Sequence, residues 1–79
     1  MAARKQRAAY RKSYEMSRDY DKVLTFAKRQ HRVDEVFYIT NSDGFYSDVS
    51  ASDFKMYSYR NYDKWEFIKN KWVKTEEVQ

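Results

Sequence analysis

The sequence predicts an α+β domain in which one N-terminal helix packs on a small curved antiparallel sheet of about four or five strands. Three observations support this prediction. Good helix formers fill residues 2–32, and apolar residues there recur at helical spacing. After Val33 the apolar period shortens toward two, and aromatic and β-branched residues become frequent. The chain also has 8 Tyr, 5 Phe and 2 Trp among 79 residues, so large rings can fill a thin core.

The helix is the element that the sequence predicts most directly. Tyr20, Val23, Leu24 and Ala27 fall at i, i+3, i+4 and i+7, which places them on one apolar stripe. Ser17 is the expected N-cap, because acidic residues follow it in the first turn and basic residues occupy the last turn. We expect the first dozen residues to be flexible in the free protein, because their cations oppose the helix dipole.

Five short strands in a meander are expected after the helix, at residues 36–40, 45–49, 54–60, 65–68 and 71–75. The stretch at 41–44, Asn-Ser-Asp-Gly, predicts a four-residue loop between the first two of these strands. The third strand has a competing interpretation, because residues 51–53 are also suited to cap a short helical turn.

A second turn is expected at residues 69–70, Lys-Asn, where Asn accepts a positive φ and closes a two-residue hairpin. This register pairs Phe67 with Trp72 and Trp65 with Lys74. Trp65, Phe67 and Trp72 then share one face of the sheet, where they can receive the apolar stripe of the helix.

Charge is divided unequally along the chain. Residues 1–33 hold ten Lys or Arg against three acids, a net charge of +7, whereas residues 34–79 hold six against nine, a net charge of −3. Such asymmetry is typical of a segment that meets a polyanion. We therefore divide the chain into a basic N-terminal arm at residues 1–12 and a single compact domain at residues 13–79.

The composition argues against most catalytic and cofactor chemistry. The chain has no Cys and a single Gly, Gly44, so it offers no thiolate metal site and no glycine-rich phosphate loop. His31 is the only histidine, and we expect it to be solvated at the helix end. Asp43 and Asp48 are expected to be ordinary hairpin acids. We expect no enzyme activity, catalytic residue, metal, cofactor or small-molecule substrate.

No run of residues approaches the length of a membrane span, so we expect no membrane partner and a cytoplasmic location.

The basic arm is the remaining candidate for a functional site. Its cations can neutralise phosphates, arginine adds bidentate contacts, and the interleaved rings can stack on bases. The predicted residues for binding nucleic acid or another polyanion are Arg4, Lys5, Arg7, Tyr10, Arg11, Lys12, Tyr14 and Arg18. A passive solubilising tail, or an arm that threads into a large assembly, is the competing interpretation.

Five tyrosines after the helix exceed what one thin core can accommodate, and tyrosine is enriched at protein interfaces. They form a candidate protein interface: Tyr38, Tyr46, Tyr57, Tyr59 and Tyr62. Half-exposed tyrosine is also ordinary strand material, so both interpretations stay open.

The basic start of the chain, ARKQR at 3–7 and YRKSY at 10–14, precedes a compact aromatic α+β body without Cys or Pro. This combination resembles small phage-encoded proteins and is similar in style to some phage anti-CRISPR inhibitors. The resemblance covers mainly the first fifteen residues and is compositional. It implies an inhibitor that occupies a surface of a host nucleoprotein, whereas the net charge of +4 argues against an acidic DNA mimic.

Together these observations predict a non-enzymatic, phage-encoded basic protein that binds nucleic acid or a host nucleoprotein through its arm and inhibits it. The alternative is a structural or adaptor subunit of a larger assembly, such as a phage particle, whose arm docks on an acidic protein surface. A protein partner is expected in both cases.

Overall fold

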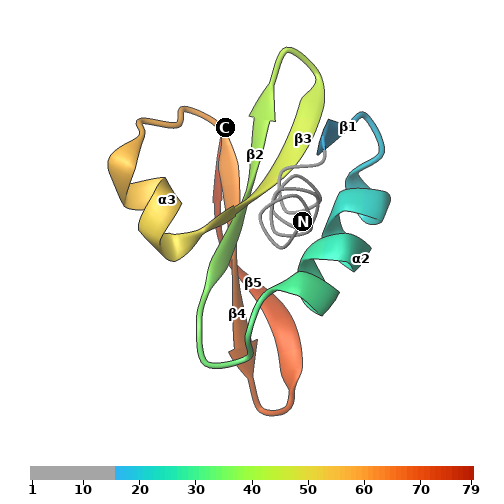
Figure 1. Cartoon of the computed structure of the whole chain (residues 1–79), viewed down its shortest axis with the longest axis vertical. Coiled ribbons are helices and arrows are strands. Elements are labelled where there is room, and N and C mark those ends of the chain that lie inside the picture. Colours follow the sequence, from blue (N-terminus) through green and yellow to red (C-terminus); the bar gives the residue numbers. More distant parts are fainter. Residues whose placement is uncertain (1–15) are drawn as a thin grey trace, which may run out of the picture.

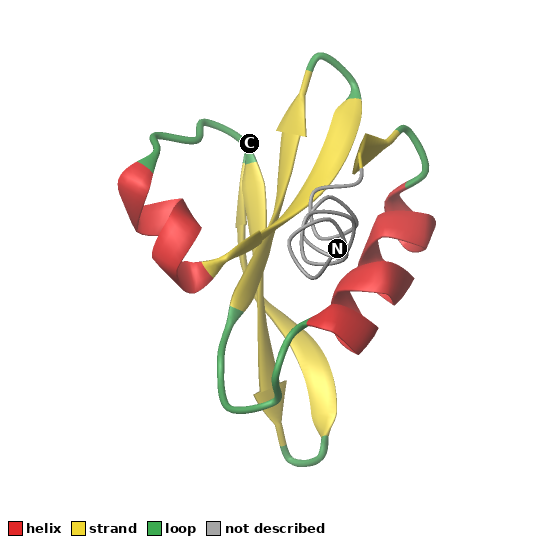
Figure 2. Ribbon diagram, in the orientation of Figure 1, coloured by secondary structure: helices red, strands yellow, loops and turns green. Residues whose placement is uncertain are grey.

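The computed structural model of this 79-residue chain describes residues 16–79, which fold as an open five-stranded antiparallel sheet with a helix on each face (Figures 1 and 2). This arrangement confirms the α+β class and the antiparallel sheet. The second helix, α3, was not part of the predicted architecture. The elements in chain order are β1 (Met16–Ser17), α2 (Tyr20–Gln30), β2 (Phe37–Ser42), β3 (Phe45–Ser50), α3 (Ala51–Met56), β4 (Tyr62–Ile68) and β5 (Lys71–Val78).

The order of the strands across the sheet is β1-β3-β2-β4-β5. The predicted meander is therefore wrong, because β4 pairs with β2 and not with the preceding strand β3. The chain leaves β3, passes through α3, and returns on the other side of β2. As a result, β2 lies at the centre of the sheet and α3 covers part of the face opposite α2.

Helix α2 begins two residues later than the sequence indicated. Its N-cap is Asp19, whose Oδ1 accepts a hydrogen bond from the backbone N–H of Lys22 at 3.3 Å. The predicted N-cap, Ser17, lies instead in β1 opposite Tyr46, and its Oγ accepts a hydrogen bond from the N–H of Asp19. Aspartate is as good a cap as serine, so sequence alone could not separate the two positions.

The predicted strand at residues 54–60 is wrong, because α3 occupies its first half. Ser50 is the N-cap of this helix, and its Oγ accepts a hydrogen bond from the N–H of Asp53 at 3.2 Å. The helical alternative was the correct one. Of the aromatic residues that suggested a strand, Phe54 stacks on Tyr38 of the sheet, Tyr59 stacks on Phe54, and Tyr57 is mostly exposed.

Both predicted turns are present, and both leave non-glycine residues at positive φ. The first is a two-residue turn at Asp43 and Gly44, with φ of 53° and 84°, and not the predicted four-residue loop. The second, at Lys69 and Asn70, has φ of 52° and 65° and confirms the predicted two-residue hairpin. Two positive φ values in a row are the geometry of a type I′ turn, which matches the twist of the paired strands.

The core lies between α2 and the centre of the sheet. Val23 and Ala27 of α2 are buried against Phe37 and Ile39 of β2, which confirms the helical stripe. The partly buried side chains packed against this cluster are Tyr20, Leu24, Tyr46, Trp65 and Trp72. Each fully buried large apolar side chain contributes roughly 1.5–3 kcal/mol, so this small cluster supplies much of the folding free energy.

The register of the second hairpin also agrees with the prediction. Phe67 pairs with Trp72, and Trp65 pairs with Lys74. The ring of Trp72 meets the ring of Phe37 edge to face, with centroids 4.8 Å apart. Trp65 and Trp72 of the predicted aromatic face therefore pack against the core, and Phe67 contacts the ring of Trp72.

Candidate functional site

Most of the predicted polyanion-binding residues lie outside the described residues: Arg4, Lys5, Arg7, Tyr10, Arg11, Lys12 and Tyr14. The predicted boundary between residues 12 and 13 lies outside them as well. Arg18, which follows β1, is described and is exposed. Its guanidinium carbon is 4.7 Å from the centroid of the Phe45 ring, a cation–π distance that fixes the side chain against β3.

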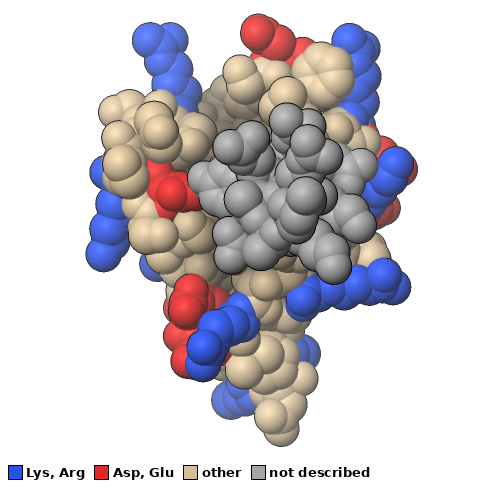
Figure 3. All heavy atoms as spheres, viewed as in Figure 1, with Lys and Arg blue, Asp and Glu red and all other residues tan. Residues whose placement is uncertain are grey.

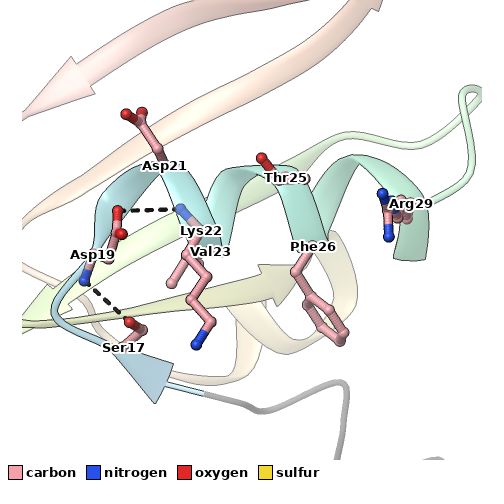
Figure 4. Close-up of a pocket in the computed structure, with 8 residues that line it drawn as sticks. All are labelled: Ser17, Asp19, Asp21, Lys22, Val23, Thr25, Phe26 and Arg29. Atoms are coloured by element: carbon pink, nitrogen blue, oxygen red, sulfur yellow. Dashed lines mark hydrogen bonds between the residues drawn. The ribbon is translucent and has the colours of Figure 1, made fainter.

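A hollow of about 450 Å³ lies beside the first turns of α2, next to the point where β1 continues from the N-terminal residues (Figure 4). Lys22 and Phe26 project to the side of the helix on which Ser17 lies, and Arg29 stands at the far end. Asp19 and Asp21 also line the hollow, and their charges balance those of Lys22 and Arg29. The hollow therefore has no net attraction for phosphate.

The five candidate interface tyrosines divide between the two faces of the sheet. Tyr46 lies on the α2 face, where its ring meets Tyr20 edge to face at 5.0 Å. Of the other four, Tyr38, Tyr59 and Tyr62 contact Phe54 of α3 on the opposite face, and Tyr57 contacts Tyr59. We call this group the α3 aromatic cluster, and it consists of Tyr38, Phe54, Tyr57, Tyr59 and Tyr62.

Phe54 is the centre of the α3 aromatic cluster. Its ring stacks on Tyr38 with centroids 3.7 Å apart and an interplanar angle of 6°. On another side it stacks on Tyr59, at 5.4 Å and 16°. Tyr62 meets the Phe54 ring edge to face at 4.7 Å. Sequence reasoning did not single out Phe54, although an aromatic residue one turn after a serine cap was a usable signal.

The rim of the α3 aromatic cluster is exposed. Tyr57 is 62% exposed and Met56 is 73% exposed. Lys55 and Arg60, which flank these residues in the chain, are also exposed, and neither forms an ion pair with a described carboxylate. Burial, with smaller contributions from nearby groups such as Asp53, raises the pKa of Tyr59, so its ring stays neutral at neutral pH.

His31 is not the solvated helix-end residue that the sequence suggested. It is the C-cap of α2, is half-buried, and stacks on Phe37 with ring centroids 5.0 Å apart. Its Nε2–H donates a hydrogen bond to Oδ2 of Asp48 at 2.8 Å. Asp48, predicted to be a plain hairpin acid, is only 2% exposed, and its Oδ1 has no hydrogen-bond partner among the described residues.

A second polar group crosses the α2 face near the start of the helix. The Tyr20 hydroxyl donates a hydrogen bond to Oδ2 of Asp63 and accepts one from Nε1 of Trp65 at 3.2 Å. Burial, followed by the hydrogen bond to Asp63, raises the pKa of Tyr20. Lys74 donates to Oε1 of Glu77 at 2.8 Å, and this hydrogen bond is the largest cause that raises the pKa of Lys74.

These two polar groups have structural roles. Each buried carboxylate is held by a neighbouring side chain, and the hydroxyl of Tyr20 is kept protonated and is therefore a poor general base. No group of three or more metal-capable side chains gathers within residues 16–79. Neither helix of that part of the chain has the length and apolar content needed to span a lipid bilayer.

The charges of the folded part cancel. Residues 1–15 hold five of the 16 Lys and Arg and one of the 12 Asp and Glu, so residues 16–79 hold eleven of each. Basic and acidic side chains are interspersed around the face shown in Figure 3. The net charge of +4 thus belongs entirely to the first fifteen residues.

No protein-family model matches this chain, and no match is found among curated proteins or solved structures.

Proposed function

We propose that this chain is a non-enzymatic binding protein that attaches to nucleic acid, or to a nucleoprotein, through its basic N-terminal arm. One observation carries the proposal: residues 1–15 hold all of the net positive charge, while the described residues carry eleven cations and eleven acids. A neutral body contributes little long-range attraction to a polyanion, so the arm must supply it. The cytoplasm is the compartment in which such a partner is met.

The residues of the arm suit phosphate. Arg4, Arg7 and Arg11 offer planar, bidentate donors, and Tyr10 and Tyr14 offer rings that stack on bases. Arg18 extends this set onto the folded part, where its contact with Phe45 holds it next to β1. A cationic segment speeds association with a polyanion, and a small rigid body attached to it fixes the orientation of the complex.

A matched pair of variants tests the proposal. Arg11→Gln/Lys12→Gln removes two cations from the arm, and Lys69→Gln/Lys71→Gln removes two from the β4–β5 hairpin of the folded part. Fluorescence anisotropy with a labelled oligonucleotide at about 0.1 M salt measures the affinity. We expect the arm variant to bind at least about tenfold more weakly, because each lost phosphate contact costs roughly fivefold at that salt. Equal affinities of the two variants would contradict the proposal.

The alternative function is an adaptor subunit whose arm docks on an acidic protein surface. The exposed side chains of Met56 and Tyr57 favour a protein partner. Capture of partners with and without nuclease separates the two functions. Partners that disappear after nuclease treatment support nucleic-acid binding, whereas protein partners that remain support the adaptor.

If the target is a nucleoprotein and the chain inhibits it, as the resemblance to anti-CRISPR proteins implies, adding the chain lowers the activity of that target.

A further inference from the structure

We propose that the α3 aromatic cluster is a stacking platform for the bases of a single-stranded nucleic acid, and that Lys55 and Arg60 hold the adjoining phosphates. This inference rests on the proposed function and deepens it, because it names the form of nucleic acid and a second contact on the folded body. It uses described residues only and does not depend on the arm.

The geometry of the rings is the first argument. Tyr38, Phe54 and Tyr59 form a nearly parallel series, with interplanar angles of 6° and 16° between neighbours. A base can extend such a series, because stacking needs a flat ring and no particular hydrogen-bond pattern. Tyr57, 62% exposed and 6.3 Å from Tyr59 between centroids, places a further ring at the open edge.

The positions of the cations are the second argument. Lys55 lies in the last turn of α3, and Arg60 directly follows Tyr59. Both are exposed, and neither forms an ion pair with a carboxylate of residues 16–79, unlike Arg32, which contacts Asp34 at 3.1 Å. Along residues 54–60, the rings of Phe54, Tyr57 and Tyr59 are interleaved with these two cations, an order that suits the alternation of bases and phosphates along a strand.

The same features favour a single strand over the other classes of partner. The core of a protein interface is depleted of lysine, whereas here Lys55 directly precedes the exposed Met56 and Tyr57 in the chain. A duplex keeps its bases stacked inside and is read by an element that enters a groove. Helix α3 has only six residues, and its one aromatic side chain, Phe54, packs on Tyr38 of the sheet, so it is not suited to that role.

Substitutions at Tyr57 give the sharpest test, because this side chain is mostly exposed and its replacement should leave the fold intact. Tyr57→Leu keeps an apolar side chain and removes the flat ring. Tyr57→Phe keeps the ring and removes the hydroxyl. The matched control is Met56→Ala, which removes exposed apolar surface at the neighbouring position without removing a ring.

The probe is a labelled oligothymidylate of about 12 nucleotides, compared with an abasic strand of the same length. We expect Tyr57→Leu to weaken oligothymidylate binding by about 5- to 100-fold, the range for one lost base stack, and to leave abasic-strand binding unchanged. Tyr57→Phe and Met56→Ala should bind like the parent protein. Circular dichroism of each variant verifies that the fold is retained.

The contribution of the cations is measured by salt dependence. Lys55→Gln/Arg60→Gln should reduce the magnitude of the log–log salt slope for oligothymidylate by about 1.4, because two phosphate contacts are lost. Tyr57→Leu should leave that slope unchanged, because no charge is removed.

The outcomes separate this inference from the proposed function. If the parent protein binds neither strand at low salt, the proposed function fails and the inference fails with it. If the parent binds and Tyr57→Leu binds oligothymidylate equally well, the inference alone is overturned. It is also overturned if Tyr57→Leu loses a protein partner while its oligothymidylate affinity is unchanged, since the cluster would then be a protein interface.

Discussion

At the scale of single residues, the pair formed by His31 and Asp48 departs most from what the sequence suggested. A histidine in the last turn of a cationic helix is usually solvated, and an aspartate in a hairpin strand is usually exposed. The register places Asp48 opposite Ile39, and therefore on the buried face under the end of α2. His31 donates a hydrogen bond to Oδ2 of this carboxylate, so the two residues compensate each other in part across 17 positions of sequence.

This pair predicts a measurable loss of stability in His31→Phe. Phenylalanine keeps the stacking on Phe37 but removes the N–H donor, which leaves the buried carboxylate of Asp48 without its partner. We expect the free energy of unfolding in urea to fall by about 1–3 kcal/mol. The double variant His31→Phe/Asp48→Val should recover part of that loss, because no unpaired polar group remains. A single variant as stable as the parent would show that the hydrogen bond contributes nothing.

At the scale of elements, the hairpin of β4 and β5 was predictable and α3 was not. Two short segments rich in aromatic and β-branched residues, 65–68 and 71–75, flank a Lys-Asn turn. The two-residue turn fixes the register, and the observed pairs agree with it. Residues 51–60 carry conflicting signals. Residues 51–53 suit the start of a helix, whereas the aromatic residues that follow are typical of a strand. Local propensity cannot settle such a conflict, because tertiary packing of Phe54 on Tyr38 decides it.

The cap of α3 gives a prediction at this scale. Ser50→Ala removes the acceptor for the N–H of Asp53 and should lower the free energy of unfolding by about 0.5–2 kcal/mol. Ser47→Ala is the control, because it makes the same chemical change in the same strand β3 without affecting a helix cap. Thermal or urea unfolding of the two variants provides the comparison. Equal losses in both would contradict the assignment of Ser50 as the cap.

At the scale of the whole molecule, the order of the strands depends on pairings between distant segments. The sequence indicates where strands occur, but the pairing of β2 with β4 follows from the passage through α3, which local patterns do not encode. The net charge of a segment, unlike strand pairing, is a sum over its residues and can be read directly from the sequence. The concentration of cations in the first fifteen residues was therefore visible from sequence, whereas the gathering of three tyrosines around Phe54 required the fold.

Charge and aromatic side chains are concentrated in different parts of the molecule. The folded part, whose charges cancel, carries a partly exposed aromatic cluster on one face and buried polar pairs on the other, and the first fifteen residues carry the net positive charge. Under the two proposals, binding by the arm and stacking on α3 would contribute through different physical terms, one dependent on salt and one independent of it.

The most direct test of the central proposal is the salt dependence of oligonucleotide affinity for the parent protein and for a variant in which Arg4, Lys5, Arg7, Arg11 and Lys12 are all replaced by glutamine. If these five cations hold phosphates, the magnitude of the log–log slope should fall by roughly 3.5 for a single strand or 4.5 for a duplex. Identical slopes and affinities for the two proteins would contradict the account.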